Sequence, residues 1–177
     1  MRTLTALGIL YTWDKAGRYV FTKGDLAKLF DEPEASLHKT LERLVSTDVL
    51  VRAAQGVYVF GYSAHLGAYT IEHIAQTLRR NDYNYLSLES ALSEWGVISQ
   101  VPIDRLTVMT TGRKGEFKTP FGVIEFTHTE MNPEYILQNT VKRDSHPLPI
   151  ANVDLALANQ RRVGRNVFLI EENEVSW

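Results

Sequence analysis

An amphipathic helix pattern followed directly by a β-hairpin pattern is the feature that most constrains this fold. Over residues 34–46, apolar side chains recur at the spacing of one helix face. Residues 49–52 and 57–60 are rich in β-branched and aromatic residues and flank a tight Gln55-Gly56 turn, which predicts two antiparallel strands. The apolar side chains of the helix are Leu37, Leu41, Leu44 and Val45.

The residues before this helix predict a helix, a short strand and a second helix. The first helix ends at Gly17, the strand covers residues 19–22, and Thr22 with Asp25 forms a capping-box-like start for the second helix. Pro33 separates the second helix from the third. The order helix, strand, helix, short turn, helix, hairpin is typical of a winged helix-turn-helix. The expected apolar face of the first helix consists of Leu4, Leu7, Gly8 and Tyr11, widened by Leu10.

A winged helix can bind DNA because its third helix fits the major groove and its hairpin reaches the adjacent backbone. On this basis Arg43 is expected to contact guanine and Lys39 a phosphate, while the alternative is that these charges form a solvated face of a protein-binding module. The predicted DNA-binding residues are Ser36, Lys39, Thr40 and Arg43 on the helix, with Arg52 and Gln55 on the hairpin.

The charge of the chain gives little support to nucleic-acid binding. The net charge is −2, with +1 in residues 1–63 and −3 in residues 64–177. The case for DNA therefore depends on the pattern of elements. Because the charge is near zero, we expect single copies to bind weakly and two copies, monomeric in solution, to pair on inverted repeats.

Composition excludes several kinds of chemistry. There is no cysteine, so no disulfide or thiolate site can form. His128 and Glu130 could form part of a metal site but lack further ligands nearby. We therefore expect no metal, no cofactor and no enzyme activity. The apolar stretch at residues 1–14 is too short and interrupted to be a signal peptide or membrane span, which favours a cytoplasmic protein without membrane association.

After a short Gly61-Tyr62-Ser63 hinge, the apolar periodicity restarts. We therefore expect two domains, residues 1–63 and residues 64–177, and we expect the first to bind DNA alone. Within the second, the pattern predicts helices at residues 68–80 and 150–163. The other expected elements are an extended stretch at residues 83–86, a helix capped by Ser87 and ending at Gly96, strands at residues 106–111, 123–127 and 167–170, and a turn at residues 112–116.

Three runs within residues 85–127 resemble the AbiEi family of antitoxins. These runs are Tyr-Leu-Ser-Leu-Glu-Ser-Ala-Leu at 85–92, Thr-Val-Met-Thr-Thr-Gly-Arg at 107–113 and Phe-Lys-Thr-Pro-Phe-Gly at 117–122. The resemblance implies an α+β chain in which a winged helix precedes a small mixed α/β antitoxin domain. It also implies a phage-defence role in abortive-infection loci: neutralising a nucleotidyltransferase-like toxin and repressing the shared operon. The family's usual tail helix is replaced here by the sequence of residues 150–158.

Two basic clusters are candidate partner-binding surfaces, because clustered charge steers encounter. The plainer interpretation is that both are solvated. The first comprises Arg113, Lys114 and Lys118, and the second comprises Arg161, Arg162 and Arg165.

Besides the antitoxin and autorepressor, two other classes of function stay open. One is a transcriptional regulator whose residues 64–177 dimerise or sense a ligand. The other is an enzyme that inactivates a toxin covalently, although the sequence contains no nucleotide-binding motif to support it.

Overall fold

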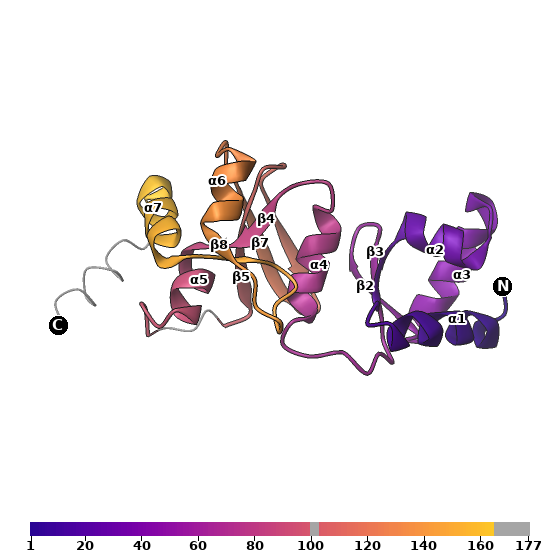
Figure 1. Cartoon of the computed structure of the whole chain (residues 1–177). Coiled ribbons are helices and arrows are strands. Elements are labelled where there is room, and N and C mark those ends of the chain that lie inside the picture. Colours follow the sequence, from indigo (N-terminus) through magenta and orange to yellow (C-terminus); the bar gives the residue numbers. More distant parts are fainter. Residues whose placement is uncertain (100–102, 165–177) are drawn as a thin grey trace. The chain divides into compact units, whose positions relative to one another are not determined.

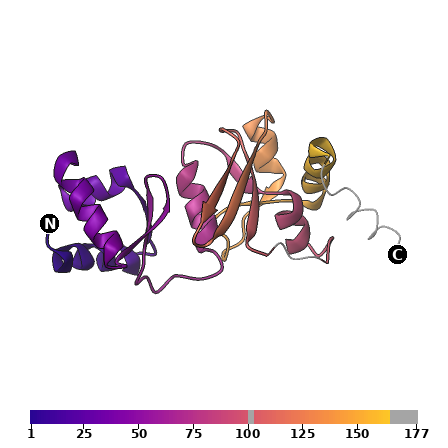
Figure 2. The same ribbon diagram turned by 180° about the vertical axis from the view of Figure 1, so that it is seen from behind.

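The computed structural model describes residues 1–99 and 103–164. The chain divides into two compact units, Met1–Leu78 and Arg79–Trp177, called here the first and second units. Both combine helices with a β-sheet, which confirms the expected α+β class (Figures 1 and 2). No helix of the described part of the chain is long and apolar enough to cross a membrane.

The first unit contains the expected elements in the expected order. Its sheet has the order β1-β3-β2 with both pairs antiparallel. The hairpin strand β3 is therefore central and pairs with β1 on its other side. Phe21, Leu26, Leu44 and Phe60 are buried in its core. The elements are α1 (Thr3–Lys15), β1 (Val20–Thr22), α2 (Lys23–Phe30), α3 (Glu34–Ser46), β2 (Leu50–Ala54), β3 (Val57–Phe60) and α4 (Thr70–Leu78).

Local side-chain hydrogen bonds fix where α2 begins. The backbone N–H of Asp25 donates to Thr22 Oγ1 at 3.0 Å, and the N–H of Thr22 donates to Asp25 Oδ2 at 2.8 Å. This is the complete capping box that the Thr-x-x-Asp spacing predicted.

The buried face of α1 differs from the sequence expectation. Ala6, Leu10 and Asp14 are buried, whereas Leu4, Gly8 and Tyr11 are exposed. The reason is that Asp14 has partners far along the chain: its carboxylate accepts hydrogen bonds from Ser63 Oγ and from the N–H of Ala64. A buried carboxylate is acceptable only when it is hydrogen-bonded.

The same contacts extend the first unit beyond the expected boundary at Ser63. Tyr19 Oη lies 3.1 Å from Thr70 Oγ1, and the Tyr19 ring packs edge-on against His73 of α4. The helix expected at residues 68–80, observed as α4, therefore belongs to the first unit and not to the second.

We predict that His73 makes the first unit less stable in mild acid. Burial lowers the pKa of His73 below its ordinary value of 6.5, and the nearby His65 lowers it further. Between the lowered pKa and 6.5, the unfolded chain binds a proton that the folded chain does not, so stability falls as pH drops below about 6.5 and is unaffected above it. Urea unfolding at pH 7.5 and 5.5 measures the effect. His73→Gln should reduce the difference between the two pH values, and an unchanged difference would contradict the prediction.

The second unit is built on a six-stranded sheet with the order β6-β7-β5-β4-β9-β8. The β5–β7 and β4–β9 pairs are parallel, and the other pairs are antiparallel. The elements are β4 (Asn84–Leu86), α5 (Leu88–Glu94), β5 (Arg105–Thr110), β6 (Gly115–Thr119), β7 (Gly122–His128), α6 (Pro133–Gln138), β8 (Thr140–Val141), β9 (Ile150–Ala151) and α7 (Val153–Val163).

Three local expectations for the second unit need correction. The helix expected at residues 150–163 begins only at Val153, because Ile150 and Ala151 form the strand β9. Residues 115–119, expected partly as turn and partly as a lead-in, form the edge strand β6. Ser87 occupies the N-cap of α5, but its side chain makes no capping hydrogen bond. Instead, its Oγ accepts a hydrogen bond from Asn159 Nδ2 at 2.8 Å, because α7 packs against α5. The expected strand at residues 167–170 lies outside the described residues.

Candidate nucleic-acid interface

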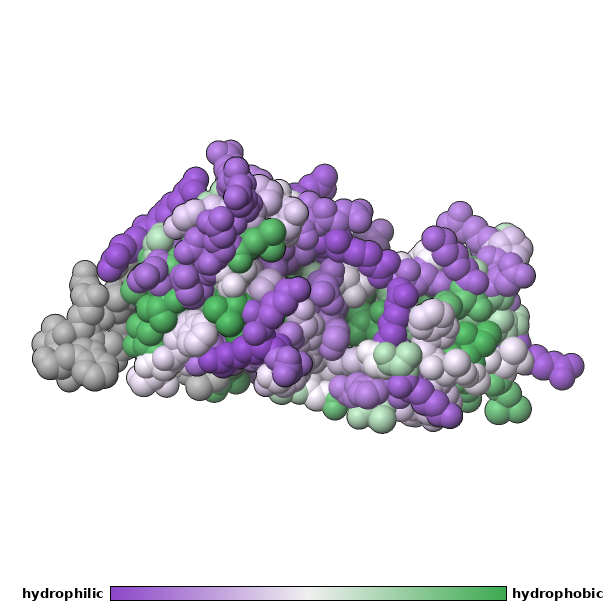
Figure 3. All heavy atoms as spheres, viewed as in Figure 1, coloured by the Kyte–Doolittle hydropathy of each residue, from purple (hydrophilic) through white to green (hydrophobic). Residues whose placement is uncertain are grey.

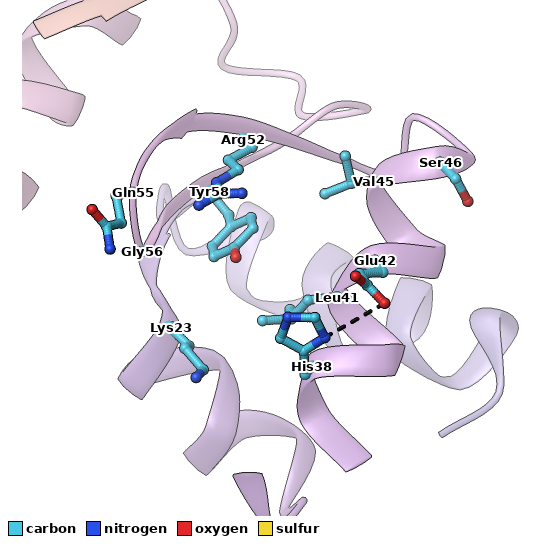
Figure 4. A pocket seen from close by; sticks show the side chains of 10 residues that line it. All are labelled: Lys23, His38, Leu41, Glu42, Val45, Ser46, Arg52, Gln55, Gly56 and Tyr58. Atoms are coloured by element: carbon cyan, nitrogen blue, oxygen red, sulfur yellow. Dashed lines mark ion pairs between the residues drawn. The ribbon is translucent and has the colours of Figure 1, made fainter. Parts of the chain in front are cut away.

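The hairpin of the first unit and one side of α3 enclose a hollow of about 560 Å³. Figure 4 shows His38 and Glu42 of α3 on one side of it and Arg52 and Tyr58 of the hairpin on the other. Polar and charged side chains from both the helix and the hairpin therefore line the hollow, together with apolar ones. The lining residues are Lys23, His38, Leu41, Glu42, Val45, Ser46, Arg52, Gln55, Gly56 and Tyr58.

The structure brings together two predicted DNA-binding residues with several that the sequence did not single out. Arg52 and Gln55 are exposed and line the hollow, as expected for hairpin residues near a groove. His38, Glu42 and Lys23 were not predicted. For the two residues of α3 a sequence signal was available: both side chains lie away from the direction of Leu37 and Leu44, the centre of the buried face.

The outward face of α3 is rotated relative to the predicted one. Ala35, Lys39, Glu42 and Ser46 are all exposed, at the spacing i, i+4, i+7, i+11. Lys39 is therefore on the outward face as predicted. This face carries one acidic group as well as one basic group, so it is close to neutral.

Thr40 is not a surface residue, and its prediction as a DNA contact is wrong. Its side chain is only 3% exposed and lies on the buried face beside Leu37 and Leu44. A hydrogen bond between Thr40 and Glu32 helps to hold the pKa of Glu32 below its usual value, after the larger effect of the N-terminal amine. Thr40 is thus part of the structural contact between α3 and the chain before it.

Ser36 and Arg43 are exposed, but both are engaged within the protein. Ser36 Oγ donates a hydrogen bond to the Pro33 carbonyl at 3.0 Å, which stabilises the first turn of α3. Arg43 Nη2 donates to the carbonyl of Met1, which precedes α1. For either to contact DNA, these bonds must be exchanged for bonds to the nucleic acid.

Two basic side chains that line the hollow lie next to carboxylates, which reduce the positive charge that the hollow presents. His38 Nδ1 lies 3.5 Å from Glu42 Oε2, and both side chains are 67% exposed. Lys23 Nζ donates to Glu34 Oε1 at 2.7 Å, which lowers the pKa of the Glu34 carboxyl. Exposed pairs of this kind are worth little, so an approaching phosphate can compete for Lys23.

The two basic clusters of the second unit lie on different elements. Arg113 and Lys114 are exposed in the turn between β5 and β6, and Lys118 is exposed on β6. Arg161 and Arg162 are exposed in the last turn of α7, and Arg165 lies outside the described residues.

The turn that carries Arg113 is rigidly supported. Arg79 Nε donates to the Arg113 carbonyl at 3.0 Å, while the Arg79 guanidinium lies 4.7 Å from the ring centroid of Phe126 and 5.2 Å from that of Phe117. Cation–π contacts of this kind fix a basic side chain against an apolar face. Because β6 is an edge strand, the exposed Lys118 on it also has a plainer role in discouraging strand pairing between molecules.

Among the described residues, no group of three or more His, Asp or Glu side chains lies close enough to hold a metal ion. His128 uses Nδ1 to donate to the Gly112 carbonyl at 2.7 Å.

Fold and surface define a two-unit α+β protein whose first unit presents a helix beside a β-hairpin. The chain belongs to a protein family described as of unknown function, DUF6088, whose model matches residues 17–143. No curated protein matches the chain.

Among solved structures, the chain is similar to the crystal structure of the RV2827C protein from Mycobacterium tuberculosis. The two share 16% sequence identity with a TM-score of 0.61 over 90% of this chain. The match covers 60% of the mycobacterial protein, so this chain spans less than two thirds of its length. At this identity the likeness establishes the fold alone.

Proposed function

We propose that the first unit is a winged helix-turn-helix that binds duplex DNA, and that the protein represses transcription. The single observation that carries the proposal is the hollow between α3 and the β2–β3 hairpin, because a helix and an adjacent hairpin are the two elements that a winged helix presents to DNA. Lys39 and Arg52 are the cations that contact phosphate in this proposal. Gln55 and His38 are the side chains positioned for polar contacts beside them.

The proposal is tested by selecting bound sequences from a randomised duplex pool with the full chain and measuring affinity at several salt concentrations. Enrichment of a defined sequence supports it. Binding whose affinity is the same for every sequence, or no binding at low salt, contradicts it.

We predict that Lys39→Ala weakens binding to all duplexes alike. Removing one lysine–phosphate interaction should reduce the slope of log K against log salt by about 0.9. The same is expected for Arg52→Ala. Lys28→Ala is the matched control, because Lys28 is an exposed lysine in the last turn of α2 and lies on neither α3 nor the hairpin, the two elements that the proposal places on DNA. If Lys28→Ala and Lys39→Ala change the slope equally, the DNA-binding face lies elsewhere on the first unit.

We further propose that the second unit neutralises a toxin, as the resemblance to AbiEi antitoxins implies. The observation that favours it is that the resembling segments fall on consecutive elements, β4, α5, β5, β6 and β7, of one unit. The second segment ends in the supported turn at Arg113, and the third begins on the strand β6 that follows the turn. The inferred partner is a nucleotidyltransferase-like protein encoded beside this chain, and the repressed promoter is that of their shared operon.

We predict that reversing two charges on this turn separates the two activities. The double change Arg113→Glu and Lys114→Glu should abolish growth rescue on co-expression with the neighbouring reading frame, while promoter repression persists, because the turn belongs to the second unit. Lys142→Glu is the control, since Lys142 is another exposed lysine of the same unit. A neighbouring gene product that is harmless alone would instead favour the regulator with a dimerisation or ligand-sensing unit.

A further inference from the structure

An acidic side chain lies on the part of α3 that faces directly away from the core of the first unit. Ala35, Glu42 and Ser46 are exposed and lie almost in line, because their positions i, i+7 and i+11 are separated by nearly whole turns of a helix. This line is opposite Leu37 and Leu44, which are buried. In Figure 3, hydrophilic residues predominate over the upper part of the first unit, where Figure 1 labels α2 and α3.

Glu42 is the long side chain of this line. Ala35 and Ser46 are short, so a bound partner can come close to the backbone of α3 while Glu42 reaches towards it. The Glu42 side chain is 67% exposed and also lines the hollow, together with Arg52 and Gln55 of the hairpin (Figure 4). A carboxylate is therefore presented at the candidate interface itself.

The stability of α3 does not account for this carboxylate. It lies 3.5 Å from His38 Nδ1, but both side chains are exposed, and exposed pairs contribute little. In addition, His38 precedes Glu42 along α3, which is the less favourable order of a basic and an acidic side chain four residues apart in a helix. The position of Glu42 is better explained by what α3 contacts.

DNA offers few suitable partners to a carboxylate. The phosphates repel it, because the DNA backbone is negatively charged. In the major groove, guanine and thymine offer acceptors to a side chain, and adenine offers the acceptor N7 beside its N6 amino group. Cytosine offers only a donor, its N4 amino group, so it is the base to which a carboxylate bonds best.

We propose that Glu42 recognises one cytosine of the bound DNA by accepting a hydrogen bond from its N4 amino group, and thereby determines the base preferred at one position of the binding site. The inference rests on the proposed DNA binding of the first unit, and it names a residue and a base that give this binding its sequence preference. Lys39 and Arg52, as phosphate contacts, supply the attraction that offsets the repulsion between Glu42 and the DNA backbone.

The first test repeats the selection from a randomised duplex pool with the unaltered full chain, Glu42→Gln and Glu42→Ala. The unaltered chain should enrich cytosine at one position. Glu42→Gln should enrich adenine at that position, because the glutamine amide both accepts from adenine N6 and donates to adenine N7. Glu42→Ala should leave that position without a preferred base, and all other positions should be unchanged in both variants.

The second test measures affinity for the selected duplex and for a duplex of unrelated sequence. Glu42→Ala should bind the selected duplex about tenfold more weakly, which is the loss expected for one base contact. The same variant should bind the unrelated duplex more tightly, because a charge that the phosphates repel has been removed. A variant that merely destabilises α3 would weaken binding to both duplexes.

Asp31→Asn is the matched control. It also removes one exposed acidic charge from the first unit, but Asp31 follows α2 and lies on neither α3 nor the hairpin. Asparagine suits the left-handed backbone of this residue, whose φ is 50°, so folding should be preserved. Asp31→Asn should keep the base preference of the unaltered chain at every position.

The outcomes distinguish this inference from the function on which it rests. If the unaltered chain enriches a defined sequence and Glu42→Gln enriches the same base at every position, the assignment of Glu42 is wrong while the proposed DNA binding stands. Equal weakening of Glu42→Ala on the selected and unrelated duplexes would also overturn the assignment. If the unaltered chain enriches no sequence, the proposed function fails and the assignment of Glu42 fails with it.

Discussion

A fragment ending at Leu78 is expected to fold cooperatively and bind DNA, whereas a fragment ending at Ser63 should be largely unfolded at the same temperature. The shorter fragment lacks α4, which contacts β1 and β3 and whose Ile74 and Ala75 are fully buried in the intact chain. Burying an isoleucine side chain such as that of Ile74 is worth about 1.5–3 kcal/mol, and burying the single methyl group of Ala75 adds about 0.8 kcal/mol. The shorter fragment also leaves Tyr19, which is 2% exposed in the intact chain, without Thr70 and His73.

The stability that α4 contributes is comparable to the whole stability of a domain this small. The free energy of unfolding of a unit of this size is only about 5 kcal/mol, so removing α4 is expected to remove most of that stability. Circular dichroism during urea unfolding of both fragments measures the difference, and gel shift with the selected duplex measures function. The expectation fails if the fragment ending at Ser63 shows the same unfolding midpoint as the longer one.

The second large effect is expected from adding one methyl group at Gly61. Gly61 follows β3 and its N–H donates to the Val49 carbonyl at 2.9 Å, which draws the two backbones together. A Cβ at Gly61 would collide with the backbone oxygen of Asp48, and backbone cannot move aside as the tip of a side chain can. Overpacking typically costs about 1–3 kcal/mol, and a collision with backbone lies at the upper end of that range.

For a unit of this size, that cost corresponds to a fall in Tm of roughly 10–20 °C. Calorimetry of Gly61→Ala in the full chain measures it, with the transition of the first unit as the affected one. Gly67→Ala is the control, because a Cβ at Gly67 meets nothing within 4 Å. A Tm for Gly61→Ala within about 3 °C of the control would show that the strand end relaxes at low cost.

The sequence predicts well what is decided by neighbours along the chain. The capping box at Thr22 and Asp25 and the hairpin around Gly56 depend on residues within a few positions of one another, and both expectations are confirmed. The order of elements in the first unit follows from such local signals.

Expectations failed where distant residues decide the outcome. Pattern rules disfavour a buried face on α1 that contains Asp14, yet Ser63 and Ala64 from beyond the hairpin satisfy that carboxylate. In the same way, no residue near Ser87 in the sequence indicates that the Ser87 hydroxyl will accept a hydrogen bond from the side chain of Asn159. The parallel pairing of β5 with β7 also has no local signature.

The candidate interface was predicted in part. Arg52 and Gln55 were assigned correctly to the exposed hairpin, because a tight turn projects its flanking side chains. Thr40 was assigned to the wrong face because its polarity outweighed its position, one turn from both Leu37 and Leu44. The participation of Lys23 depends on how α2 packs, which periodicity alone does not give.

The strand order of the second unit has a consequence for synthesis on the ribosome. β4 lies in the sheet between β5 and β9, and its register with β9 pairs Leu86 with Ile150. The sheet therefore cannot be completed until the chain has been made past residue 151, whereas every element of the first unit has been made by Leu78. At about 5–20 residues per second, the interval is roughly 4–15 s. Each nascent chain thus passes through a period in which its first unit can fold while the central strands of the second still await their last partner.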